Sequence, residues 1–145
     1  MSGSTDEGFV SALMVGEYDS DRILVYDVFR KLGWRLFEAR DRRRAMDCLG
    51  TNAVQVVLTE GGPQRWNWRH VLNDLRSLVH PPQLIVTARM ADDALWAEVL
   101  NVGGYDVLAR PLHEDEVERV VAAARRQFDR PERTSVRPAV AAGAA

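Results

Sequence analysis

Two carboxylates, a hydroxyl and a guanidinium stand at or just after the ends of four apolar segments of this sequence. The carboxylates are Glu17 and Glu60, and they are joined by Thr87 and Arg110. The carboxyl ends of parallel strands meet at one rim of an open sheet, where ligands bind, so we expect these four side chains to lie close together. Polar residues follow strands on any such rim, so the residue types alone leave open both a polar site and a set of solvated strand ends.

Residues 55–60 form the clearest of these segments. Val56, Val57 and Leu58 make a continuous apolar run, which is typical of a strand buried on both faces of a sheet. The run stops at Glu60, and turn-forming residues follow it. A lone glutamate more often points into solvent, so its role depends on what else reaches the same rim.

Strand-like and helix-like segments alternate along the chain. The predicted strands cover residues 12–15, 34–39, 55–60, 84–87 and 105–109. Apolar residues at helical spacing lie between and after them: Ile23, Leu24, Val28, Phe29 and Leu32; Ala45, Cys48 and Leu49; Val71, Leu72, Leu75, Leu78 and Val79; Leu95 and Val99; and Val117, Val120, Val121, Ala124 and Phe128. Repeated β-α units of this kind predict an α/β fold, a (βα)5 doubly wound, five-stranded parallel sheet of the flavodoxin type with helices on both faces.

Short polar residues and glycines suggest where the helices begin and end. Asp19 or Ser20 is suited to cap the first helix, and Asp41 the second. Gly50 marks the predicted end of the second helix. The third helix must stop before Pro81, because the residue before a proline avoids helical conformation.

A length of 145 residues indicates a single domain with a core large enough to be stable. We expect that domain to cover residues 11–128. Residues 1–10 are expected to form a disordered lead and residues 129–145 a disordered tail, because both offer little apolar surface to bury against the entropy of ordering.

Composition excludes several classes of protein. The single Cys48 excludes a disulfide within the chain and a thiolate zinc site, and the three histidines lack ligand spacing. There is no apolar run of about 18 residues and no signal-peptide pattern, so we expect a cytoplasmic protein with no membrane contact. A net charge of -2 gives no overall attraction to nucleic acid.

The order and spacing of four features resemble those of response-regulator receiver domains, over roughly residues 11–128. The features are a first apolar strand that ends in an acid, the strand at residues 55–60, Thr87-Ala88 after the fourth strand, and residues 103–111. The last of these is similar to that family's alanine- and glycine-rich lead into a lysine-proline pair. Order and spacing together carry the resemblance.

The resemblance implies a role for each rim position. In the family, an aspartate that ends the third strand is phosphorylated, two acids after the first strand help to hold Mg²⁺, and a threonine or serine ends the fourth strand. A lysine that contacts the phosphoryl group precedes a cis-proline. Thr87 and Pro111 match this pattern. The departures are Gly16 and Glu17 at the two acids, Glu60 at the phosphoacceptor, Arg110 at the lysine, and Val107 at a switch position that is usually aromatic.

These departures make the chain a degenerate, pseudo-receiver member that should not carry out phosphotransfer. Mg²⁺ requires near-octahedral oxygen ligation, so losing one acid at Gly16 and lengthening another at Glu60 should leave its binding weak or absent. The extra methylene of Glu60 also shifts the attacking oxygen by more than about 1 Å, and misplacement on that scale costs about a hundredfold in rate. We therefore expect no enzymatic activity and no cofactor.

A further hypothesis gives Glu60 a positive role. Its carboxylate extends part-way toward the place of a phosphoryl group, and a forked pair with Arg110 would fix one conformation without a signal. Glutamate carries one negative charge against about -1.5 to -2 for a phosphoryl group, so it imitates that group only in part. Thr87 either bonds to Glu60 or satisfies backbone groups, and Val107 either marks a missing switch or is an ordinary strand residue.

The predicted function is that of a protein-interaction module in bacterial-type signalling, with a signalling protein or a histidine kinase as its partner. The family often dimerises through its fourth helix, fifth strand and fifth helix, which makes a homodimer a further expectation. The alternative function is a working response-regulator receiver that a histidine kinase phosphorylates in two-component signalling or a phosphorelay.

Two groups of residues outside the rim are candidates for binding. Arg40, Arg42, Arg43 and Arg44 surround the start of the second helix, where the helix dipole disfavours cations, so they form either an anion- or partner-binding surface or a solvated face. Three tryptophans are either partner anchors or core residues. They are Trp66, Trp68 and Trp96.

Overall fold

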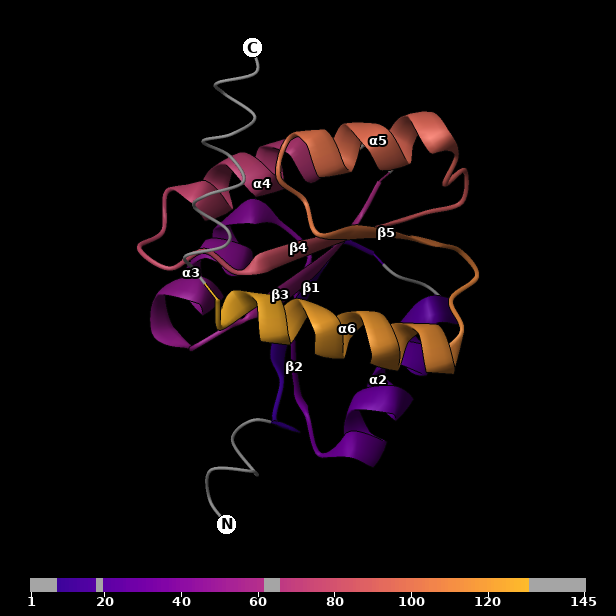
Figure 1. Ribbon diagram of the computed structural model, residues 1–145. Coiled ribbons are helices and arrows are strands. Elements are labelled where there is room, and N and C mark those ends of the chain that lie inside the picture. The colour runs from indigo at the N-terminus through magenta and orange to yellow at the C-terminus, as the bar shows by residue number, and fades with distance from the viewer. Residues whose placement is uncertain (1–7, 18–19, 62–65, 131–145) are drawn as a thin grey trace.

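The computed structural model describes residues 8–17, 20–61 and 66–130 (Figure 1). Strands and helices alternate along the chain, as predicted. The elements are β1 (Ser11–Val15), α2 (Ser20–Leu32), β2 (Arg35–Ala39), α3 (Arg42–Thr51), β3 (Val56–Glu60), α4 (Trp68–Arg76), β4 (Gln83–Ala88), α5 (Asp93–Asn101), β5 (Asp106–Ala109) and α6 (Glu114–Phe128). All strand pairs are parallel, in the order β2-β1-β3-β4-β5. The predicted doubly wound α/β fold is confirmed.

The sheet is covered on both faces. Figure 1 shows α2 and α6 on one face and α3, α4 and α5 on the other. Successive strand residues enter opposite cores: Met14 and Leu58 pack with α2 and α6, whereas Leu13 and Val57 pack with α4 and α5. All four side chains are buried. Burial on two sides explains why the central strands are continuous apolar runs.

Helix ends agree with the sequence in part. The Asp41 side chain caps α3, accepting a hydrogen bond of 2.9 Å from a first-turn backbone N–H, as predicted. Gly50 does not end that helix, which continues for one more residue and is capped by Asn52. The two candidate caps for α2, Asp19 and the side chain of Ser20, lie outside the described part of the chain.

The apolar face predicted for α2 is wrong at two positions. Ile23 is 65% exposed and Leu32 is 37% exposed, although the sequence pattern placed both in the core. The buried stripe runs through Val25, Val28 and Phe29. Leu32 has the same phase as Val25 and Val28 but is the last residue of the helix, whereas Ile23 lies on the opposite side.

The third predicted helix is shorter than its apolar pattern. α4 ends at Arg76, and the Ser77 hydroxyl donates to the Asp74 carbonyl at 2.6 Å where the chain turns. Val79, predicted to lie on the apolar stripe, is therefore fully exposed. Nowhere in the described segments is a helix both long and apolar enough to cross a membrane.

The amino-terminal segment is attached to the domain before β1. Val10, which the sequence assigned to the lead, is 1% exposed in the core. The Trp34 indole N–H donates to the Gly8 carbonyl at 2.7 Å, and Arg125 Nε donates to the Phe9 carbonyl at 2.8 Å. The rest of the predicted lead, and the tail from residue 131 onward, lie outside the described residues.

Candidate functional site

Glu60 and Arg110 meet at the rim formed by the carboxyl ends of the strands. Arg110 Nη1 donates to Glu60 Oε2 at 3.0 Å. The Arg110 side chain is 13% exposed and the Glu60 side chain 11% exposed, so the ion pair lies largely out of water. Removing one partner of such a pair is strongly destabilising, because the other charge is left buried and uncompensated.

The guanidinium is shared with a second carboxylate, Asp21 at the start of α2, which sequence reasoning missed. Arg110 Nε donates to Asp21 Oδ2 at 2.6 Å, and the Leu112 backbone N–H donates to Asp21 Oδ1 at 3.3 Å. Asp21 is 6% exposed. The Arg110 guanidinium was predicted to pair with Glu60 alone, but its Nε donates to Asp21.

A signal for Asp21 was present in the sequence. It lies four residues before Val25 and seven before Val28, and thus on the buried stripe of α2. A carboxylate on the core-facing stripe of a helix must find a donor, because burying an unpaired charge is very unfavourable.

Gly16 and Glu60 are fitted to one another. Gly16 has φ 119°, a backbone conformation that residues with a side chain rarely adopt, and an added Cβ would lie 2.6 Å from Glu60 Oε1. The same Oε1 accepts a hydrogen bond of 3.1 Å from the Glu17 backbone N–H. The long Glu60 side chain thus occupies space that a side chain at position 16 would need.

The remaining rim residues differ in what they contribute. Glu17 is exposed, and its backbone rather than its carboxylate contacts Glu60. Thr87 is completely buried and lies opposite Glu60 in the β3–β4 register. The Arg110–Pro111 peptide bond is cis. Val107 is 8% exposed and packs in the core on the face covered by α4 and α5.

The donor set does not fit the Mg²⁺ that the resemblance implies. Position 16 supplies no carboxylate, and both oxygens of Glu60 accept hydrogen bonds, from Glu17 N–H and Arg110 Nη1. A guanidinium in this position competes with a cation for the same oxygens, whereas Mg²⁺ requires several oxygens at short distance. Across residues 8–17, 20–61 and 66–130, no group of three or more His, Cys, Asp or Glu side chains is arranged to hold a metal ion.

The three tryptophans have different environments. Trp68 is 5% exposed in the core, and Trp66 is partly buried, with its indole N–H donating to Asp74 Oδ2 at 2.9 Å. Trp96 is 49% exposed on α5, and its indole N–H donates to Asp106 Oδ1 at 3.2 Å. Of the three, Trp96 is the one whose exposure suits a partner contact.

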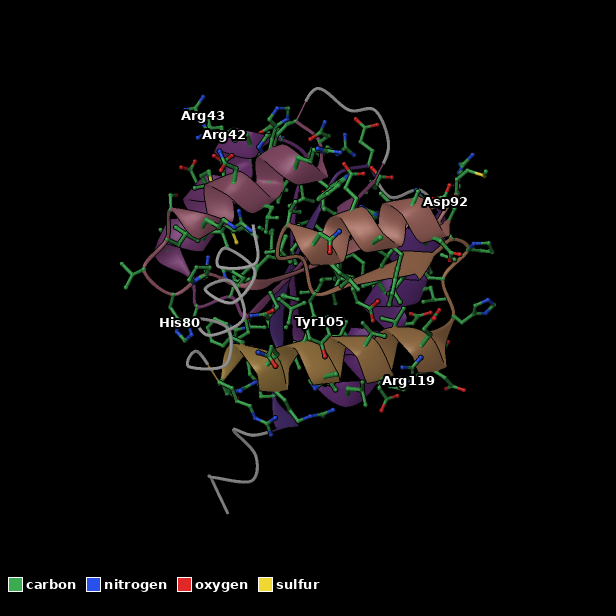
Figure 2. The ribbon with its side chains drawn as sticks, turned by 45° about the horizontal axis from the view of Figure 1, so that its top comes forward. Arg42, Arg43, His80, Asp92, Tyr105 and Arg119 are labelled. Carbon is green, nitrogen blue, oxygen red and sulfur yellow. The ribbon has the colours of Figure 1, made fainter. Side chains whose placement is uncertain are left out.

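The arginines around the start of α3 lie on the surface, where Figure 2 labels Arg42 and Arg43. Arg42 Nε donates to Asp74 Oδ2 on α4 at 2.8 Å. This hydrogen bond, assisted by that from Trp66, lowers the pKa of Asp74 below its ordinary value. Arg42 thus joins two helices, while Arg40 and Arg43 are exposed.

Comparison with known proteins identifies the architecture. No family model matches the sequence, and no curated protein matches it. Among solved structures, the signal receiver domain of a putative Luxo repressor protein from Vibrio parahaemolyticus is similar with a TM-score of 0.74 and 17% identity, covering 85% of this chain and 95% of that one. The signal receiver domain of an HD domain-containing protein from Pseudomonas fluorescens Pf-5 is similar with a TM-score of 0.71 and 19% identity, covering 83% and 97%.

A third similar structure is the receiver domain of the Francisella response regulator 1452, with a TM-score of 0.67 and 20% identity over 81% of this chain and 98% of that one. Each of these likenesses spans nearly the whole of the other domain. At these low sequence identities, the similarities establish the fold and not the chemistry of the site. The chain has the receiver-domain fold.

Proposed function

We propose that this chain is a receiver-like signalling module that works through protein contacts and does not depend on phosphorylation. The observation that carries the proposal is the buried cluster in which Arg110 bonds to both Glu60 and Asp21. In this reading, Glu60 supplies a permanent negative charge beside the cation. The module therefore stays in one conformation and requires no phosphodonor.

Charge and burial support this reading. Glu60 carries one negative charge where a phosphoryl group would carry about -1.5 to -2, so it satisfies one arm of the guanidinium and leaves another for Asp21. The low exposure of all three side chains strengthens their interaction relative to water. Both oxygens of Glu60 already accept hydrogen bonds, one from the Glu17 backbone N–H and one from Arg110, which does not favour attack on a phosphodonor. We accordingly propose a binding function rather than catalysis.

The first test is the intact mass of the full chain after incubation with acetyl phosphate, with and without Mg²⁺. We expect no phosphoryl adduct on the parent protein under either condition. Glu60→Asp shortens the side chain and opens space beside position 16, and Gly16→Asp/Glu60→Asp also returns the missing acid. If the parent gains a phosphoryl group that depends on Mg²⁺, the working-receiver alternative replaces the proposal.

A partner surface is proposed on α5, β5 and α6, which would serve a signalling protein, a histidine kinase or a second copy of the chain. Trp96 is half-exposed there, and Met90, just before α5, is 78% exposed. Aromatic residues of this kind are enriched among binding hot spots. Sedimentation of the parent and of Trp96→Ala tests self-association. A concentration-dependent dimer of the parent that Trp96→Ala does not form would favour the homodimer. If the parent and the variant are both monomers, the proposed occupant of this surface is another protein.

A further inference from the structure

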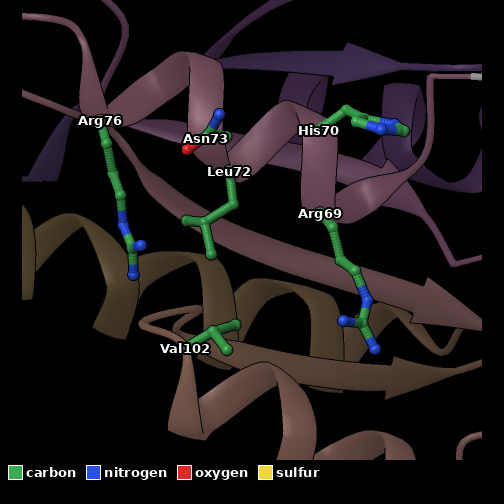
Figure 3. A pocket seen from close by; sticks show the side chains of 6 residues that line it. All are labelled: Arg69, His70, Leu72, Asn73, Arg76 and Val102. Carbon is green, nitrogen blue, oxygen red and sulfur yellow. The ribbon is translucent and has the colours of Figure 1, made fainter.

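A small open pocket lies between α4 and the turn that joins α5 to β5. Its volume is about 240 Å³, and its lining consists of Arg69, His70, Leu72, Asn73, Arg76 and Val102. Figure 3 shows that the Arg69 and Arg76 side chains extend from α4 in the same direction, on either side of Leu72 and Val102, while His70 points elsewhere. Two cations therefore flank an apolar floor.

The backbone of the turn makes room for one of these cations. Gly103 has φ 109°, and an added Cβ would lie 2.5 Å from an Arg76 guanidinium nitrogen. A glycine at this position allows the turn and leaves space for Arg76. Within the described parts of the chain, Arg76 forms no ion pair with a carboxylate, so its charge faces the pocket uncompensated.

The second cation is only weakly engaged. Arg69 forms an ion pair with Glu98 of α5 and lies over the Trp68 ring, 5.3 Å from its centroid. The Arg69 side chain is 59% exposed and the Glu98 side chain 36% exposed. An exposed pair contributes little to stability, so an incoming carboxylate can compete for Arg69 at small expense.

We propose that this pocket binds a short acidic peptide segment of a partner protein. Arg69 and Arg76 are seven residues apart on α4, which is roughly 10 Å along the helix axis. The two side chains extend in the same direction (Figure 3), which suits two separate anionic groups better than one. Two acidic side chains four residues apart on an extended chain lie on one face about 13 Å apart, which the long arginine side chains can span, and the side chain midway between them lies on the same face. The surface makes no use of Glu60 or Arg110, so it goes beyond the proposed function and does not depend on it.

The floor and the surroundings favour a peptide over nucleic acid. Val102 is 37% exposed, and together with Leu72 it offers an apolar contact between the two guanidinium groups. A peptide can place an apolar side chain between two acids, whereas a phosphate backbone cannot. The neighbouring α5 carries Asp93 and Glu98, with Asp92 as its cap, and these carboxylates repel a long polyanion that extends past the pocket.

The test uses a fluorescein-labelled peptide of about twelve residues with two glutamates four positions apart and a leucine midway between them, and a matched peptide with glutamines instead. Anisotropy is measured with the full chain at low ionic strength, where exposed charges interact most strongly. We expect Arg76→Gln and Arg69→Gln each to weaken binding about tenfold. Glu98→Gln, which releases Arg69, should strengthen it severalfold. Arg119→Gln on α6, whose position Figure 2 labels, is the matched control and should leave binding unchanged.

Three results would overturn the proposal. They are equal binding of the glutamine peptide, an equal loss of binding in Arg119→Gln and Arg76→Gln, and tighter binding of a short DNA duplex that the pocket variants abolish. The last would assign the pocket to nucleic acid. Circular dichroism of every variant identifies a loss that comes from unfolding. Since both arginines are on the surface, we expect all spectra to match that of the parent.

Discussion

At the scale of single residues, the rim depends on the absence of a side chain as much as on the charged groups. An oxygen of Glu60 lies 2.6 Å from the place of a Cβ at position 16, and Gly16 has a backbone conformation that favours glycine. The two departures from the receiver pattern are thus linked by geometry. The absence of a side chain at position 16 creates the space in which the long Glu60 side chain fits.

The first prediction concerns this fit. Gly16→Ala should destabilise the chain by about 2–3 kcal/mol, because it adds backbone strain and a steric conflict with Glu60. In a Glu60→Ala background the steric part disappears, so the same substitution should be less costly by about 1 kcal/mol, as measured by urea unfolding in a double-mutant cycle. Gly50→Ala is the control: it lies in α3 with open space around it and should be neutral or stabilising. Additive effects of Gly16→Ala and Glu60→Ala would contradict the coupling.

The second prediction concerns Asp21. Asp21→Ala removes the acceptor for Arg110 Nε and for the Leu112 N–H, and it should destabilise the chain by about 3 kcal/mol. Asp21→Asn keeps an oxygen for Leu112 but loses the charge, so its effect should be smaller. The matched control is Asp27→Ala on the same helix, which removes an exposed pair with Arg30 and should have little effect. Equal unfolding midpoints for Asp21→Ala and Asp27→Ala would show that the buried contact contributes nothing.

At the scale of elements, α3 and α4 are joined through Asp74. This carboxylate accepts hydrogen bonds from Arg42 on α3 and from the Trp66 indole, at 2.8 Å and 2.9 Å. The hydrogen bond from Arg42 is the largest cause of the lowered pKa of Asp74. The arginine run and the loop tryptophans were treated as separate candidates for binding in the sequence analysis. One residue of each, Arg42 and Trp66, donates a hydrogen bond to the same carboxylate, that of Asp74.

The third prediction follows from the direction of that pKa shift. A carboxyl group whose pKa is lower in the folded state stabilises the fold above its unfolded pKa, and the contribution is lost as the pH falls through the folded value. Asp74→Asn should therefore lower the urea midpoint at neutral pH. The difference from the parent should shrink as the pH falls below about 4 and disappear once both states are protonated. A difference between parent and variant that stays constant from neutral to acidic pH would exclude an ionic origin.

The elements also show how far the sequence could be read. The strands were predicted well, because a strand that is buried on both faces is a continuous apolar run. No choice between a buried and an exposed face has to be made for it. A helix must be read with a phase, and in α2 Ile23 was assigned to the buried side although it lies opposite Val25. Asp21 was missed because site residues were sought at strand ends, whereas Asp21 lies in the first turn of a helix. Glu60 and Arg110 were found because strand ends have a fixed place in a parallel sheet, whereas the first turn of a helix carries several side chains, only some of which face the rim.

At the scale of the whole molecule, the cluster of Asp21, Glu60 and Arg110 connects distant parts of the chain. Asp21 and Arg110 are 89 residues apart in sequence, and Glu60 and Arg110 are 50 apart. One guanidinium thus holds the start of α2, the end of β3 and the segment after β5 together. The proposed fixed conformation requires that these three segments stay in contact. That contact can be tested without knowing the partner.

The last prediction uses amide hydrogen exchange. Arg110→Gln leaves two buried carboxylates without their shared cation, so exchange should rise at the start of α2, at the end of β3 and around Leu112 together. Arg110→Lys keeps the charge but lacks the planar fork that reaches Asp21 through Nε and Glu60 through Nη1, and its effect should be intermediate. Arg119→Gln on α6 should leave all three segments unchanged. If Arg110→Gln alters exchange only in the residues next to position 110, the three segments are held by the core alone, and Glu60 then has no part in fixing the conformation of the module.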